Sequence, residues 1–291
     1  MRPTPFEYHR AESLDHALAL LAEFGEEGRP LGGGQSLVPM MNLRLARPAH
    51  LVDINGLPLD FIEVEGDVLR VGALVRHERY LKEKVIGERF AAFHDAVQWI
   101  GHPTIRSRGT IGGSIAHADP SAELPAVAML YGATIIARSA NGERRIAADD
   151  FFLGAYMTAL EAGEMVVAVE FPLPPAHSAG AFMEISERRS DFATVSVGAQ
   201  ITFSGGSITG ARIVATGVEL QPIRAIPAEE ALSGKPLSAC EARAAGRAFA
   251  EGIDPISDNV ASSEYRRSLA AELTSRAVEK ACQRALEAGQ E

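Results

Sequence analysis

Residues 31–39 of the chain read LGGGQSLVP, and residues 109–116 read GTIGGSIA. Because glycine has no Cβ, a glycine run lets the backbone curl until successive N–H groups point into one concavity. A hydroxyl residue in each segment, Ser36 in the first and Ser114 in the second, can add a side-chain donor. Two such segments, each beside an apolar strand-like stretch, predict a diphosphate held from both sides, as in a dinucleotide cofactor.

The first segment matches neither of the two common phosphate-binding motifs. Gln35-Ser36 stands where a phosphate-loop NTPase requires Gly-Lys followed by Ser or Thr. The glycine spacing also differs from Gly-x-Gly-x-x-Gly, which disfavours a Rossmann site for NAD. The sequence therefore favours a different dinucleotide-binding fold. A glycine-rich turn with a purely structural role is the alternative.

The composition narrows the class of protein. The chain has 291 residues, 46% of them hydrophobic, which is enough for two or three compact lobes. A net charge of −10 argues against nucleic acid or an anionic membrane surface as the main partner. No run approaches the ~18 consecutive apolar residues of a membrane span, and the N-terminus has no signal-peptide pattern. We expect a soluble protein located in the cytoplasm.

The residues that bind metals in other proteins form no pattern here. Cys240 and Cys282 are 42 positions apart, which does not match an iron–sulfur or four-cysteine zinc site. We expect two free thiols, the usual state in a reducing compartment. His102 and His117 lack a third ligand at suitable spacing. The sequence therefore predicts no metal site, and no Ser-His-Asp or Cys-His pattern indicates a catalytic residue.

The hydrophobic pattern predicts an α+β protein without an internal repeat. A capped amphipathic helix is expected at 13–24, and Pro172-Leu173-Pro174-Pro175 is the clearest domain boundary. We expect a first domain at 1–176, with lobes at about 1–55 and 56–176, and a second α+β domain at 177–291. Strands are expected at 50–54, 68–73, 133–138, 144–147, 165–171, 194–203 and 208–218. Asn141-Gly142, between the third and fourth of these strands, is expected to form a tight hairpin turn. Further helices are expected at 76–85, 88–100, from Pro120 onward and at 263–288.

Polar and aromatic residues near the second glycine segment suggest further contacts to a ligand. Ser114, His117 and Asp119 offer the hydroxyl and carboxylate partners that a ribityl chain needs. Phe192, in the segment RRSDFA, could present its ring to a planar ligand at a domain interface. The simpler interpretation is that the charged residues are solvated and that RRSDFA begins a strand.

Four segments together form a more specific pattern. With these segments in this order, the chain resembles, almost end to end, the medium flavoprotein subunit of molybdenum hydroxylases of the xanthine dehydrogenase and aerobic CO dehydrogenase type. The resemblance implies the two-lobed FAD-binding fold shared with vanillyl-alcohol oxidase (the PCMH type). It also implies a C-terminal α+β domain of the CO dehydrogenase flavoprotein type. The segments are GGGQSLVPMMNLRLARP followed by HLVDIN, IRSRGTIGGSIAHADPSAELP, RRSDFATVSVGA and EYRRSLAAELTSRAVEKA.

The resemblance also implies which residues bind FAD. The two glycine segments match the pyrophosphate contacts, and Asp119 and Glu123 match carboxylates near the ribityl and adenosine portion. Phe192 matches the aromatic position beside the isoalloxazine, where relatives often carry Tyr. The expected cofactor contacts are Leu31, Gly32, Gly33, Gly34, Gln35, Ser36, Leu37, Thr110, Ile111, Gly112, Gly113, Ser114, Asp119, Glu123 and Phe192.

Two departures from the family pattern bear on the chemistry. Gln35 stands where CO-oxidising relatives carry His, and the Gln form is more similar to members that oxidise heterocycles or aromatic compounds. Because Gln35 cannot form a histidyl–flavin bond, the FAD is expected to be non-covalent. A family Lys appears here as Glu184, and no role is carried over to it.

In this family the substrate is oxidised at a molybdenum–molybdopterin cofactor in a large subunit. Electrons then cross two [2Fe–2S] clusters in a small subunit to reach FAD in the medium subunit. The resemblance implies an electron-transfer subunit without catalytic acid or base, in a dimer of heterotrimers. The substrate would be an aromatic N-heterocycle, CO or an aldehyde, and the acceptor NAD, a quinone, a cytochrome or oxygen.

Two other functions are compatible with the sequence. A stand-alone FAD-dependent oxidase or dehydrogenase of the same fold would need its own substrate pocket and base over the flavin. A non-enzymatic nucleotide-binding or assembly module would need neither. The presence of both complete glycine segments and of Phe192 argues against the second alternative.

Overall fold

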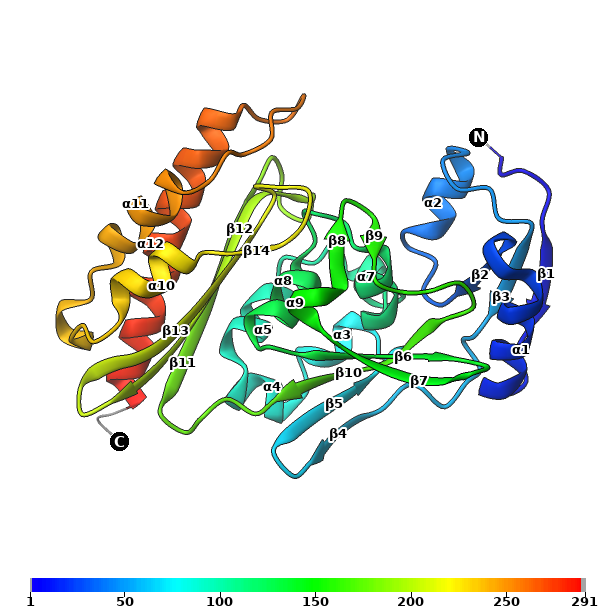
Figure 1. Cartoon of the computed structure of the whole chain (residues 1–291), viewed down its shortest axis with the longest axis horizontal. Helices are drawn as coiled ribbons and strands as arrows, with labels where there is room; N and C mark the ends of the chain where they lie inside the picture. Colours follow the sequence, from blue (N-terminus) through cyan, green and yellow to red (C-terminus); the bar gives the residue numbers. More distant parts are fainter. Residues whose placement is uncertain (1, 289–291) are drawn as a thin grey trace.

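The chain forms three main sheets, each covered by helices, that follow one another along the sequence (Figure 1). The structure is a computed structural model that describes residues 2–288. The mixed helix and strand content confirms the predicted α+β class. In the described part of the chain, no helix combines the length and the apolar character that crossing a membrane requires.

The N-terminal sheet is parallel, with the strand order β1-β3-β2. Helix α1 packs on it, and the Ser13 side chain accepts a hydrogen bond from the His16 N–H, as expected for an N-cap. Leu18 and Leu21 of α1 and Val52 of β3 are buried in one core. The elements of this lobe are β1 (Glu7–Arg10), α1 (Leu14–Phe24), η1 (Gly25–Glu27), β2 (Gly28–Leu31), α2 (Leu37–Asn42) and β3 (His50–Asp53).

The central sheet is antiparallel, with the order β4-β5-β10-β6-β7. The β6–β7 hairpin turns at Asn141-Gly142, where Gly142 has a φ of 136°, as the sequence predicts. The strands are β4 (Ile62–Glu65), β5 (Val68–Gly72), β6 (Thr134–Ser139), β7 (Gly142–Ala147) and β10 (Met165–Pro172), with a small hairpin of β8 (Phe152–Gly154) and β9 (Met157–Thr158). The helices are α3 (His77–Tyr80), α4 (Lys84–Arg89), α5 (Ala91–Val97), α6 (Pro103–Arg106), α7 (Ile111–His117), α8 (Glu123–Leu130) and α9 (Ala148–Phe151).

The predicted helices at 76–85 and 88–100 are wrong in their extent. Three shorter helices, α3, α4 and α5, replace them, with breaks at 81–83 and at Phe90. Phe90 has a φ of −124° and a ψ of 57°, outside the helical region, and its side chain is fully buried. Packing of this ring against Tyr131 and Phe171 outweighs the local helical preference.

The C-terminal sheet has the order β11-β12-β13-β14 and is covered on one side by helices α10, α11 and α12 (Figure 1). The long helix predicted at 263–288 is confirmed as α12. Cys240 and Cys282 are free thiols in this part of the chain, as expected. The elements are β11 (Ser178–Ser186), β12 (Ala193–Ser204), β13 (Ser207–Thr216), β14 (Ile223–Arg224), α10 (Ile226–Leu232), η2 (Leu237–Ala239), α11 (Ala242–Glu251) and α12 (Ser263–Ala288).

The opposite face of the C-terminal sheet packs against helices α5 and α8 of the central part. Phe182 and Val214 of this sheet belong to the same buried cluster as the central helices. The Arg284 guanidinium of α12 donates to the two carboxylate oxygens of Asp95 on α5, at 2.6 and 3.0 Å. The C-terminal sheet is thereby fixed beside the central part, with the residues before β12 facing the first two sheets.

Candidate functional site

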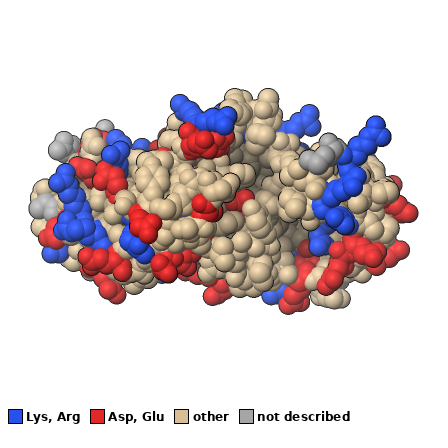
Figure 2. Space-filling model, turned by 90° about the horizontal axis from the view of Figure 1, so that it is seen from above, with Lys and Arg blue, Asp and Glu red and all other residues tan. Residues whose placement is uncertain are grey.

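A cavity of about 1140 Å³ lies where the N-terminal and central parts meet, and residues before β12 complete its wall. Figure 2 shows the corresponding hollow between the centre of the molecule and the N-terminal lobe. The cavity exceeds the ~300–1,000 Å³ of most small-ligand sites, so a ligand larger than a mononucleotide fits it. Both glycine-rich segments line it.

The first glycine segment forms an open turn between β2 and α2. Gly34 has a φ of +69°, a conformation that favours glycine, and a Cβ at Gly33 would lie 2.1 Å from the Arg108 carbonyl oxygen. Within residues 2–288, the backbone N–H groups from Gly33 to Ser36 have no hydrogen-bond acceptor. Consecutive donors of this kind are what an oxyanion ligand requires.

A polar clamp outside the cavity holds the first segment against the second. The Asn55 side-chain amide donates to the carbonyl oxygens of Leu31 and Gly32, at 3.2 and 3.0 Å. The Arg76 guanidinium donates to the Asn55 side-chain oxygen at 2.6 Å and also to the carbonyl oxygen of Arg108. Since Arg108 immediately precedes the second segment, these two side chains fix the distance between the two segments.

The second glycine segment uses its donors differently. Thr110 is the N-cap of α7, and its hydroxyl accepts from the Gly113 N–H at 3.2 Å. The Gly112 N–H donates to the carbonyl oxygen of Ala73 at 2.9 Å, and the Ser114 N–H donates to that of Thr110. The backbone N–H groups of Gly112, Gly113 and Ser114 therefore already have acceptors within the fold. This segment contributes to the cavity wall through its backbone, which a ligand can approach closely because glycine has no side chain, and through the Ser114 hydroxyl.

The chain after α7 carries carboxylates to the cavity wall. Ala118 ends α7 in the left-handed conformation, and its carbonyl oxygen accepts from the Tyr156 N–H at 3.0 Å. Asp119 accepts from the Ser121 N–H and from the Tyr156 hydroxyl, at 2.9 and 3.2 Å. Burial, and then Asp119, raises the pKa of Tyr156, so this phenol stays a neutral donor. The Asp119 carboxylate is thus held in one orientation.

Two further carboxyl groups on this side of the cavity are buried. Glu123 begins α8 and lines the cavity, and Glu184 lies on the buried face of β11. Burial raises the pKa of both, helped at Glu123 by Asp119 and at Glu184 by Glu123. The strand register places Glu184 beside Ser196, which is hydrogen-bonded to Thr216. In the described structure neither carboxyl oxygen of Glu184 has a hydrogen-bond partner, as fits a protonated group.

The structure brings nearly all the expected contact residues to this one cavity. Phe192, in the segment that precedes β12, lines the cavity, and the residue is 65% exposed. Ile111 lies elsewhere, since its side chain is fully buried in the central core and its N–H donates to the Val75 carbonyl oxygen. The expected residues that line the cavity are Leu31, Gly32, Gly33, Gly34, Gln35, Ser36, Leu37, Thr110, Gly112, Gly113, Ser114, Asp119, Glu123 and Phe192.

Several further residues of the cavity wall were not found by sequence reasoning. Tyr156 lies in the turn between β8 and β9. Arg29 and Arg47 precede and follow the first segment and are the two arginines among the described lining residues. His77 lies beside the second segment, and burial, then Arg76, lowers its pKa to about 3, so its imidazole is neutral. The arginines beside LGGGQSLVP were a signal available in the sequence, whereas Tyr156 reaches the site only through tertiary packing.

The residues present fit a dinucleotide. The open donors of the first segment suit a diphosphate, and the aromatic ring of Phe192 suits a planar ring system at another part of the same wall. At the contact between the two segments no residue larger than glycine fits at position 33, because a Cβ at Gly33 would collide with the backbone at Arg108. These features also suit FAD, whose diphosphate links a flavin to adenosine.

Comparison with known proteins agrees with this fit. Residues 4–174 match the family described as the FAD binding domain in molybdopterin dehydrogenase, and residues 180–281 match the CO dehydrogenase flavoprotein C-terminal domain. The chain belongs to this flavoprotein family. Membership confirms the resemblance inferred from the sequence, together with FAD as the family's cofactor.

Individual members are similar over nearly their whole length. The chain is 38% identical to the 6-hydroxypseudooxynicotine dehydrogenase complex subunit alpha of Paenarthrobacter nicotinovorans, over 98% of this chain and 97% of the relative. Among solved structures, it matches reconstituted CO dehydrogenase from Oligotropha carboxidovorans at a TM-score of 0.94 and 35% identity. It matches quinoline 2-oxidoreductase from Pseudomonas putida 86 at a TM-score of 0.92 and 36% identity. Both matches cover 98% of this chain and 100% of the other, which confirms the predicted fold of this flavoprotein type.

Proposed function

We propose that this chain is the FAD-binding, electron-transferring subunit of a molybdenum-containing hydroxylase. The observation that carries the proposal is the meeting of two glycine segments, about 75 positions apart, in the wall of one large cavity. Family membership supports the cofactor, and the free donors of the first segment support where its diphosphate binds. The proposed division places the FAD-binding domain at 1–176 and the second domain at 177–291.

We propose separate roles for the residues along the cavity. The N–H groups of the first segment bind the diphosphate, while Thr110 and Ser114 approach it from the other side. Asp119 and Glu123 accept hydrogen bonds from hydroxyl groups of the ribityl or ribose portion. The Phe192 ring packs against the flavin. Ile111, also expected as a contact, anchors α7 in the core.

When bound, FAD supplies the ability to accept electrons one at a time and release them in pairs. The protein's own residues hold the diphosphate, orient the ring system and exclude water from part of it. No side chain of this chain acts as acid or base on the organic substrate, which is oxidised at molybdenum in another subunit. Gln35 has no nucleophilic nitrogen, so the cofactor is held without a covalent bond.

The proposed partners are a small subunit with two [2Fe–2S] clusters and a large molybdopterin subunit, in a dimer of heterotrimers. Among the three expected substrate classes, we propose an aromatic N-heterocycle. Gln35 supports this choice, as do relatives whose names denote dehydrogenation of a nicotine derivative and oxidation of quinoline. The free thiols Cys240 and Cys282 support a cytoplasmic location.

The first test is the visible spectrum of the purified chain, followed by acid precipitation and chromatography of the supernatant. We expect flavin absorption bands and release of FAD by acid. Co-purification with an iron–sulfur subunit and a molybdenum subunit would separate this function from a stand-alone oxidase. A colourless protein that takes up no added FAD would contradict the proposal. Flavin that stays in the pellet would contradict the non-covalent binding.

A further inference from the structure

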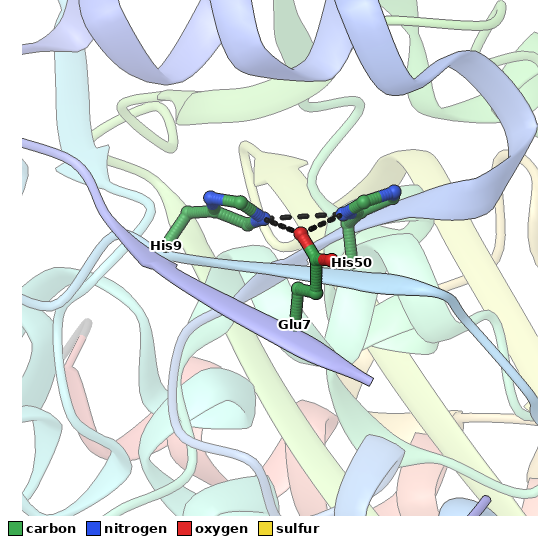
Figure 3. Close-up of side chains that lie close together, drawn as sticks. All are labelled: Glu7, His9 and His50. Atoms are coloured by element: carbon green, nitrogen blue, oxygen red, sulfur yellow. Dashed lines mark hydrogen bonds and ion pairs between the residues drawn. The ribbon is translucent and has the colours of Figure 1, made fainter. Parts of the chain in front are cut away.

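Three potential metal ligands meet on the N-terminal sheet, outside the cavity. Glu7 and His9 are two residues apart on β1, so their side chains lie on the same face of that strand. His50 is paired with Glu7 in the parallel register of β1 and β3. Figure 3 shows the two imidazoles and the carboxylate directed at one another.

The distances between the three ligand atoms match a transition-metal site. His9 Nε2 and His50 Nδ1 are 3.1 Å apart, and Glu7 Oε2 lies 3.7 Å from the first and 3.6 Å from the second. The point equidistant from these three atoms is about 2.0 Å from each. Zinc binds imidazole nitrogen at about 2.0–2.1 Å and carboxylate oxygen at about 2.0–2.2 Å. A zinc ion therefore fits with only a small displacement from the plane of the three atoms.

The two imidazoles are held in place by the fold before any cation binds. The Phe24 ring stacks on His50 with the centroids 4.0 Å apart and an angle of 10°, and it packs against His9 at 4.7 Å. The side chains of His9 and His50 are only 25% and 20% exposed. Because their rotamers are already restricted, binding a metal costs little conformational entropy at these two ligands.

The donor set selects the kind of cation. Two imidazole nitrogens and one carboxylate oxygen favour zinc and its neighbours, whereas magnesium and calcium prefer oxygen ligands. The Glu7 side chain is 72% exposed, so the side of the triangle that faces away from the sheet is open to solvent. A water molecule can therefore complete a tetrahedral site with three protein ligands.

We propose that Glu7, His9 and His50 form a zinc-binding site that joins the edge strand β1 to β3. The sheet order β1-β3-β2 leaves β1 paired on one side only, so a bound cation adds a second link between β1 and the rest of the lobe. The site is separate from the FAD cavity, because none of its three residues lines that cavity.

The test is a zinc titration of the full chain with its flavin, after removal of metals with a chelator and buffer exchange. Calorimetry and elemental analysis should give one zinc ion per chain. Cobalt(II) added in place of zinc should show the intense visible bands of tetrahedral coordination. Magnesium should not bind. Zinc binding should also raise the midpoint of thermal unfolding.

Matched variants make the test specific. Glu7→Gln keeps the shape of an exposed side chain and removes the anionic ligand, and His50→Gln removes one imidazole. Each should weaken zinc binding by at least about 100-fold, since even outer-shell changes typically cost 10–100-fold. Glu23→Gln and His102→Gln change exposed residues of the same types elsewhere and should leave zinc binding unchanged.

Flavin content should be the same in all these variants, which shows that each is folded and that the result is independent of the FAD site. Equal zinc binding by wild type and by both Glu7→Gln and His50→Gln would overturn the proposal. Absence of zinc binding by the wild type would overturn it as well.

Discussion

The two glycine-rich segments have similar compositions, yet the fold uses them in opposite ways. In the part of the chain that the structure describes, the N–H groups from Gly33 to Ser36 of the first segment donate to no backbone carbonyl group. In the second segment the N–H groups of Gly112 and Gly113 already donate to Ala73 and Thr110. The first segment therefore offers free donors to a ligand. The second segment forms the N-terminus of α7 and packs against the first.

The difference shows that a glycine run in a sequence does not by itself reveal its role. Glycine supplies free donors only where the surrounding chain leaves them unpaired. In the first segment Asn55 holds the Leu31 and Gly32 carbonyl groups, and in the described chain the N–H groups from Gly33 to Ser36 have no backbone acceptor. If this comparison is correct, substitutions in and around the two segments should have distinct effects.

Gly33→Ala should have the largest effect, because its Cβ would lie 2.1 Å from the Arg108 carbonyl oxygen and would force the two segments apart. We expect FAD affinity to fall about 100-fold, equivalent to ~3 kcal/mol. Fluorescence titration of the apoprotein with FAD measures this. Gly87→Ala is the control, since a Cβ there meets nothing within 4 Å. Equal affinity in the two variants would show that the segments need not touch.

The stability of the protein should depend on pH because two carboxyl groups near the second segment, those of Glu123 and Glu184, are buried. The pKa of Glu184 is raised by burial and by Glu123, from 4.5 to about 9. The folded state thus binds the proton more tightly, so this stabilisation is complete below pH 4.5 and is lost as the pH rises through about 9. Between those values the free energy of unfolding should fall by at most ~1.4 kcal/mol per pH unit.

Denaturant unfolding at several pH values, with wild type and Glu184→Gln, measures this dependence. The variant keeps a neutral group of the same shape, so its stability should fall less steeply with pH than that of the wild type. The dependence that remains should come from Glu123, whose pKa is raised by burial to about 7. Glu63→Gln, at an exposed position of β4, should behave as the wild type. Superimposable curves for wild type and Glu184→Gln would contradict the proposed protonation of Glu184.

Asn55→Ala should weaken FAD binding about tenfold, or ~1.4 kcal/mol, by removing the hydrogen bonds that hold the Leu31 and Gly32 carbonyl groups. The effect is smaller than that of Gly33→Ala because no atoms collide. FAD titration measures it. Asn141→Ala, in the exposed turn between β6 and β7, is the control. A loss of FAD affinity in both variants would argue against a specific clamp.

Thr110→Val should have the smallest effect on FAD, lowering its affinity by a few-fold while reducing stability by about 1 kcal/mol through loss of the α7 N-cap. Ser13→Ala removes the equivalent cap of α1, far from the second segment, and should cost similar stability without changing FAD affinity. Comparison of thermal unfolding with FAD titration separates the two effects. An unchanged FAD affinity in Thr110→Val would contradict a contact between the Thr110 hydroxyl and the cofactor.

Features that depend on neighbouring residues were predicted well. The Ser13 cap, the Asn141-Gly142 turn and the helix at 263–288 lie where expected, because each rests on interactions within a few residues or on a single periodic pattern. The helices at 76–85 and 88–100 were placed less well. The break at Phe90 was decided by the burial of its side chain, and burial is a property of the whole core.

The features of the candidate site also fall into those that the sequence predicts and those that only the tertiary structure shows. The sequence by itself determined the two glycine segments, the carboxylates after the second one and the aromatic residue before β12, because residue type and order specify their chemistry. Only the tertiary structure decided which donors remain free, which residues clamp the segments, and that Glu184 is buried. It also decided that His9 and His50, 41 positions apart, face one another through the parallel pairing of β1 and β3. The physical reason is that hydrogen-bond partners and solvent exposure depend on distant parts of the chain, and no local pattern encodes these.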